Sequence, residues 1–141
     1  MTNSNEIDSL ISAVPESYQR YIDEIYLISR NKRGGWITNK EIAEALEVKP
    51  ASVTGMLHNL KEQGLINWSE RKAIRLTDKG KKIAQQLNEI HSLLRIFFKK
   101  VLKIKNSEVV ENLSCDIEHH ITKNVKDSLK KFLTDYLEEE T

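Results

Sequence analysis

The chain has 141 residues, of which 39% are hydrophobic and 30% charged, enough apolar material for one domain or two small ones and too much for a disordered tail. A single cysteine excludes an intramolecular disulfide framework, and no run of about 18 apolar residues is present to span a membrane. Because 22 basic and 21 acidic residues leave a net charge of +1, only a local cluster of basic residues would indicate a nucleic-acid partner.

The first half of the chain predicts a helix-turn-helix behind an N-terminal extension over residues 1–16. Apolar residues at helical spacing predict a helix from Ser17, and the stretch Asn31–Gly35 is expected to stop it because paired glycines tolerate the positive φ that a C-cap needs. Thr38 and Glu41 have the spacing of a capping box and open a short helix. Pro50 begins the next helix after a tight connection. Two short helices joined in this way are a helix-turn-helix.

A small hairpin and a long helix are expected next. Two β-prone runs, 65–69 and 73–76, flank a polar segment and predict a β-hairpin, the wing of a winged helix. A long helix capped by Thr77 carries an apolar stripe as far as Leu102, and helices are expected over 107–120 and 122–137. The predicted fold is mainly α with a small β-wing: a winged helix-turn-helix domain over residues 1–82, then an all-helical domain over 83–141.

The wing and the second helix of the helix-turn-helix have the composition of a DNA-binding surface. Between Arg71 and Lys82 the sequence has six basic residues and one acidic residue, an excess of positive charge that could neutralise DNA phosphates. The second helix presents small or hydrogen-bonding groups suited to a groove. The expected contacts are Lys49, Ala51, Ser52, Thr54, Gly55, His58 and Asn59, with Arg71 and Lys72 from the wing. The alternative is a merely solvated wing, with Ser52 and Thr54 as ordinary helix-start residues. Trp36 and Trp68 are expected to pack at the ends of the sheet.

A second group of residues points to a metal. Cys115, Glu118 and His119 lie within an arc of about 100° on one helical face. A thiolate, a carboxylate and an imidazole on one face make half of a site for a divalent transition metal, and His91 and Asp23 are the candidates for the remaining donors. The alternative is structural, with Cys115 as a small buried hydrophobe and His91 as a core histidine.

The order of these motifs resembles the DtxR/MntR family of metal-dependent transcriptional repressors, in its short form without an SH3-like domain. The resemblance covers roughly Ser17 to Leu137. It rests on five stretches: Tyr21-Ile-Asp-Glu-Ile-Tyr26, Glu41-Ile-Ala-Glu-Ala-Leu46, Pro50-Ala-Ser-Val-Thr54, Leu76-Thr-Asp-Lys-Gly80 and Ile117-Glu-His-His-Ile121. The last of these, placed after a long helix that bears a histidine, is the most specific.

The resemblance implies a metal site and a regulatory role. It makes His91, Glu118 and His119 metal ligands, places Cys115 where iron-type members carry Cys, and places Asp23 where manganese-type members use Glu. The implied metal is iron(II), zinc or manganese(II), and a thiolate favours the first two. The implied protein is not an enzyme but a cytoplasmic homodimer that binds duplex operator DNA and represses metal-uptake or metal-homeostasis genes, with no membrane or small-molecule partner. The metal would bridge the two halves.

Three positions depart from the family pattern. Arg20 stands where both branches supply a ligand, and Arg95 and Glu111 stand where iron-type members place the ancillary ligands Glu and His. Because guanidinium does not ligate metals, the fixed charge of Arg20 offers a metal-independent hypothesis in which it pairs with Glu111, Asp116 or Glu118. Two further hypotheses stay open: a winged-helix regulator that answers to another ligand or to oxidation of Cys115 and, with the least support, a metal-dependent hydrolase.

Overall fold

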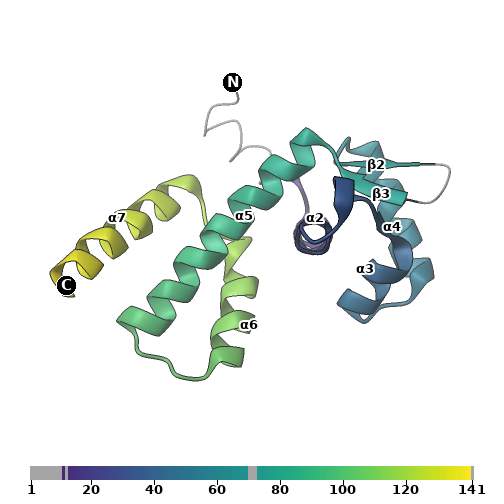
Figure 1. Ribbon diagram of the computed structural model, residues 1–141. Coiled ribbons are helices and arrows are strands. Elements are labelled where there is room, and N and C mark those ends of the chain that lie inside the picture. The colour runs from purple at the N-terminus through teal and green to yellow at the C-terminus, as the bar shows by residue number, and fades with distance from the viewer. Residues whose placement is uncertain (1–10, 12, 70–72, 141) are drawn as a thin grey trace. The chain divides into compact units, whose positions relative to one another are not determined.

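The computed structural model describes residues 11, 13–69 and 73–140 (Figure 1). Most of the predicted N-terminal extension, and the wing residues Arg71 and Lys72, lie outside the described residues. The chain divides into two compact units. The first is formed by residues 12–85, and the second by residues 86–141 together with Ile11. Of the helices described, none combines the length and the hydropathy needed to cross a membrane.

The first unit is a winged helix-turn-helix with a small sheet. Its elements are α2 (Glu16–Ser29), η1 (Arg33–Gly35), β1 (Ile37–Thr38), α3 (Asn39–Leu46), α4 (Pro50–Glu62), β2 (Ile66–Trp68) and β3 (Ala73–Leu76). The sheet is antiparallel in the order β1-β3-β2, with Ile37 opposite Ile74 and Asn67 opposite Arg75. The β2–β3 hairpin is the predicted wing, and β1 is an addition that the sequence did not predict.

The helix boundaries of this unit follow from a few local residues. The Thr38 side chain accepts from the backbone N–H of Glu41, and the Glu41 carboxylate accepts from the N–H of Thr38, which confirms the capping box. Glu47 ends α3 in the left-handed conformation, and Pro50 opens α4 as expected. Helix α2 ends at Ser29, just before the predicted stretch, but the glycines do not cap it, because its C-cap is Arg30 in the right-handed conformation. Gly34 and Gly35, at φ of 72° and 74°, instead form the tight turn of η1.

The core of the first unit is aliphatic and joins its helices to one face of the sheet. Ile22 and Ile25 of α2, Ile42 of α3 and Leu57 of α4 are fully buried, as is Ile74 of β3. The first turn of α5 (Asp78–Ile96) lies so close to this core that a Cβ on Gly80 would collide with the backbone carbonyl of Leu65. A glycine is therefore required where the long helix leaves the sheet.

The second unit is wholly helical. It contains the later part of α5, the π-helical turn η2 (Phe97–Val101), α6 (Ser107–Glu118) and α7 (Lys123–Glu140). The cluster of Ile90, Leu94, Phe98 and Val110 forms its core. The predicted long helix does not continue regularly to Leu102, because the wider turn lets two adjacent aromatics pack at once: Phe98 is buried in the core while Phe97 meets Phe132 edge to face.

Candidate metal centre and DNA-binding surface

The predicted metal cluster forms at the C-terminal end of α6. One ligand atom each from Cys115, Glu118 and His119 lies within 4.8 Å of the others. The side chains of Glu118 and His119 are 0% and 1% exposed, and Glu118 Oε1 lies 3.6 Å from His119 Nε2. The helical spacing that motivated the prediction thus brings the three groups together.

His91 reaches this cluster from α5, which runs beside α6 in Figure 1. Its Nδ1 lies 2.9 Å from Glu118 Oε2 and its Nε2 lies 2.8 Å from Glu111 Oε2. The hydrogen bond to Glu118 raises the pKa of His91, burial opposes that rise, and the hydrogen bond to Glu111 adds to it. Both nitrogens of the His91 ring are therefore held by carboxylates.

Glu111 continues the network to a fixed positive charge. Its Oε1 lies 2.6 Å from Arg95 Nε, and its side chain is 46% exposed. Burial by itself would raise the pKa of Glu111, but the bonds from His91 and Arg95 outweigh it and lower that pKa. From the sequence, Arg95 and Glu111 stood out as departures from a family pattern and Glu111 as a candidate partner of Arg20, and this network was not predicted. The available signal was spacing, because positions 111, 115 and 118 repeat at i, i+4 and i+7 on one helical face.

The donor set fits a divalent transition metal. Among the described residues none donates a hydrogen bond to the buried Glu118 Oε1, which leaves an acceptor pointing into the cluster beside a thiol and an imidazole. Donors that share a tetrahedral ion lie about 3.3–3.8 Å apart, given metal–ligand bonds of about 2.0–2.3 Å, so only small side-chain shifts separate this cluster from coordination.

The other two residues considered for this site lie in the first unit, on α2. Asp23 is half-buried there. Arg20 pairs with Glu16 one turn earlier, at 2.9 Å, and both side chains are about two-fifths exposed. Glu111 was one of the partners considered for Arg20, and the guanidinium found paired with Glu111 is that of Arg95.

The predicted DNA contacts lie on the outer side of α4. Its N-cap residue and five of the six predicted helix residues are exposed: Lys49, Ala51, Ser52, Gly55, His58 and Asn59. Thr54 is half-buried, and its hydroxyl bonds to Pro50 O at 3.1 Å and to Asn39 Nδ2 at 2.9 Å. That hydroxyl therefore ties α4 to α3.

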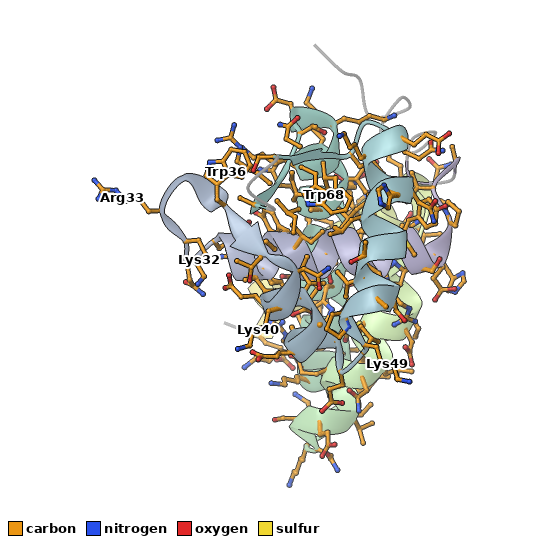
Figure 2. The ribbon with its side chains drawn as sticks, turned by 90° about the vertical axis from the view of Figure 1, so that its right-hand side faces the viewer. Lys32, Arg33, Trp36, Lys40, Lys49 and Trp68 are labelled. Carbon is orange, nitrogen blue, oxygen red and sulfur yellow. The ribbon has the colours of Figure 1, made fainter. Side chains whose placement is uncertain are left out.

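The basic residues in wing strand β3 and in the first turns of α5 differ in their surroundings. The Arg75 guanidinium lies 4.4 Å from the centre of the Trp36 ring, and Lys79 donates to Gln63 O at 3.1 Å. Lys81 and Lys82 are exposed. Trp68, visible near the centre of Figure 2, meets the His58 ring edge to face at 4.8 Å, so both tryptophans contact neighbouring side chains.

A winged helix-turn-helix joined to a helical unit with a Cys-Glu-His cluster defines the class of metal-dependent DNA-binding regulators. Comparison with known families agrees for both units. The iron-dependent repressor N-terminal DNA-binding domain matches residues 14–74, and the metal-binding and dimerisation domain of the same repressors matches residues 77–139. The chain belongs to the iron-dependent repressor family.

Individual relatives support the same assignment. The chain is 32% identical over 124 residues to the transcriptional regulator MntR of Geobacillus thermodenitrificans, covering 88% of this chain and 85% of the relative. Identity to MntR of Bacillus subtilis is 33% over 124 residues, covering 88% and 84%. Among solved structures, the metal-dependent regulator MtsR (TM-score 0.74, 29% identity) and the manganese regulator SloR (0.70, 28%) each match 83% of this chain. The chain spans about half the length of those two structures, 53% of each.

The family settles the general function and supports none of the alternatives. The chain is a metal-responsive, DNA-binding transcriptional repressor that uses a divalent metal, and it is not an enzyme, as the sequence predicted. The predicted winged helix-turn-helix followed by a helical domain is confirmed as well.

Proposed function

We propose that this repressor senses its metal through the cluster on α6 and controls genes of metal uptake or homeostasis. The observation that carries the proposal is the convergence of Cys115, Glu118 and His119 within 4.8 Å, with His91 bonded to the same glutamate. His91, Cys115, Glu118 and His119 would hold the ion, with Asp23 as the further ligand that the sequence resemblance implies. Bound there, the ion would supply a fixed positive charge to a buried carboxylate.

The donor chemistry favours a particular group of metals. A thiolate with an imidazole and a carboxylate suits iron(II), zinc or cobalt better than manganese(II), which prefers harder oxygen donors. Coupling between such a metal and DNA is expected to be about 1–3 kcal/mol, a 5–150-fold change in DNA affinity.

DNA recognition is assigned to the exposed residues of α4. Small residues at Ala51, Ser52 and Gly55 allow close approach to a groove edge, and His58 and Asn59 supply hydrogen-bonding groups one turn later. Arg71 and Lys72 remain predicted wing contacts from the sequence. Thr54 remains a predicted DNA contact, although its hydroxyl already donates a hydrogen bond to Pro50 O.

A homodimer is supported by apolar side chains left exposed on the second unit. Val109 and Leu113 lie one turn apart on α6 and are 47% and 36% exposed, while Val125 and Phe132 on α7 are 49% and 46% exposed. A second copy would cover them, and the matched family domain includes dimerisation. We accordingly assign DNA binding to residues 1–82 and dimerisation with metal binding to 83–141, in a protein that works in the cytoplasm, where its DNA would be.

Titration of metal-free protein against duplexes selected from a random pool tests this function. Iron(II), manganese(II) and zinc(II) are added in turn, and the His119→Ala variant is the control. One metal should raise the affinity at least about fivefold in the wild type and not in the variant. Equal binding with and without every metal would contradict metal sensing by this cluster. Asp23→Ala tests the ligand implied by resemblance, and it should weaken the same response.

A further inference from the structure

The turn before the helix-turn-helix carries basic side chains that the predicted DNA contacts do not include. This segment, residues 32–36, is called the basic loop here. Its tight turn at Gly34 and Gly35 leaves Arg33 at the tip, and the N–H of Gly35 donates to Lys32 O at 3.1 Å. In Figure 2 the Arg33 side chain extends outward from the loop, away from the rest of the unit.

Two contacts fix the basic loop to the rest of its unit. Arg75 of β3 stacks on Trp36 with its guanidinium 4.4 Å from the ring centre, and its Nη1 lies 3.5 Å from Gly34 O. On the other side, Lys32 Nζ lies 2.7 Å from the Glu41 carboxylate in the first turn of α3. The loop is therefore held between the wing strand and α3, and Lys32 is paired with an acid while Arg33 is left outward.

The first helix of a helix-turn-helix crosses the DNA backbone when the second helix enters the major groove. Here the first helix is α3, and Lys40 in its first turn is exposed. Its nearest acid is Glu44 at 4.0 Å, a pair whose side chains are 83% and 69% exposed and which therefore competes weakly with a phosphate. A hollow of about 550 Å³ lined by Asn39, Lys40, Pro50, Thr54 and Trp68 lies between this residue and the start of α4.

We propose that Arg33 and Lys40 bind phosphates of the DNA backbone beside the groove read by α4, so that the basic loop is a third DNA-contacting element. The inference rests on the proposed DNA contacts of α4 and extends the surface from that helix across α3 to the loop. In Figure 2 Lys40 lies between Arg33, at the left edge of the unit, and Lys49, the N-cap residue of α4 at the lower right. Contacts of this kind carry no base information, so they act equally on every sequence.

Salt dependence measures such contacts directly. The logarithm of the binding constant falls with the logarithm of salt concentration by about 0.9 for each phosphate neutralised on a duplex. Arg33→Ala and Lys40→Ala should each reduce that slope by about 0.9 per bound protomer and weaken binding about fivefold near 0.15 M salt. Both losses should be equal for a selected duplex and for a random-sequence duplex. Arg33→Lys keeps the charge and should retain the wild-type slope.

Lys105→Ala is the matched control, because it removes one positive charge from an exposed position of the second unit. All variants are measured as full-length protein with cobalt(II) present. If the slopes of Arg33→Ala and Lys40→Ala equal that of Lys105→Ala while the wild type binds DNA, this inference is wrong and the proposed function stands. If the wild type binds no duplex at any salt concentration, the proposed function falls and the inference with it.

Discussion

Removing the Glu111 carboxylate should weaken metal binding although Glu111 is not among the proposed ligands. Glu111 Oε2 lies 2.8 Å from His91 Nε2 and so orients the ring with Nδ1 toward Glu118 at 2.9 Å. Losing a carboxylate that orients a ligating histidine typically costs 10–100-fold in metal affinity. Glu111→Ala should therefore raise the cobalt(II) dissociation constant by about 10–100-fold, equivalent to about 1.4–2.8 kcal/mol.

The size of this effect can be separated from that of the neighbouring ion pair. Glu111→Gln keeps an oxygen that can accept from His91 but loses the charge that faces Arg95. Because that pair is 40% and 46% exposed, its loss should contribute at most about 1 kcal/mol, or about fivefold. Arg95→Ala should fall in the same small range.

Competition between the protein and a chelating dye for cobalt(II) measures these affinities, and the thiolate-to-cobalt absorption reports whether Cys115 still coordinates. Glu108→Ala is the control, since it removes an exposed carboxylate from the first turn of the same helix, α6. An affinity for Glu111→Ala equal to that of Glu108→Ala, with His119→Ala strongly impaired, would refute the orienting role of Glu111.

Three other substitutions have effects that follow from local geometry. Thr38→Ala removes the capping box of α3 and should lower the free energy of unfolding by about 1 kcal/mol in urea denaturation, whereas an unchanged midpoint would contradict the cap. Gly80→Ala forces a methyl group against the carbonyl of Leu65 and should cost about 1–3 kcal/mol by the same measurement. Gly55→Ala meets open space within α4 and should instead stabilise the helix by up to about 1 kcal/mol; equal effects of the two glycine substitutions would argue against the close approach at Gly80.

Local signals in the sequence predicted most of the fold. The capping box at Thr38, the proline at the start of α4 and the two β-prone runs of the wing depend on residues a few positions apart, and each was found where expected. Strand β1 was missed because two residues are too short to show alternation, and its partner Ile74 lies far along the chain from Ile37. The π-helical turn was missed because adjacent aromatics indicate it only once Phe132 is known to pack there.

The candidate metal cluster was predictable where it depended on one helix. Cys115, Glu118 and His119 share a face at the end of α6, so helical periodicity was enough to predict that they lie close together. The contact between His91 and Glu111 joins two helices, and periodicity within either helix does not define it. In the same way, the stacking of Arg75 on Trp36 joins β3 to a loop, and the sequence offered Arg75 only as one of several basic residues near the wing.

If one divalent metal and DNA act on this protein in a coupled way, the coupling must also be measurable in the binding of the metal. Because coupling between two ligands is reciprocal, DNA must tighten metal binding by the factor by which the metal tightens DNA binding. We would measure the cobalt(II) dissociation constant of the wild-type protein with and without a saturating selected duplex. We expect an affinity for cobalt(II) at least about fivefold higher with the duplex present. An unchanged dissociation constant would show that metal and DNA bind independently, so that the metal does not control DNA binding by this protein.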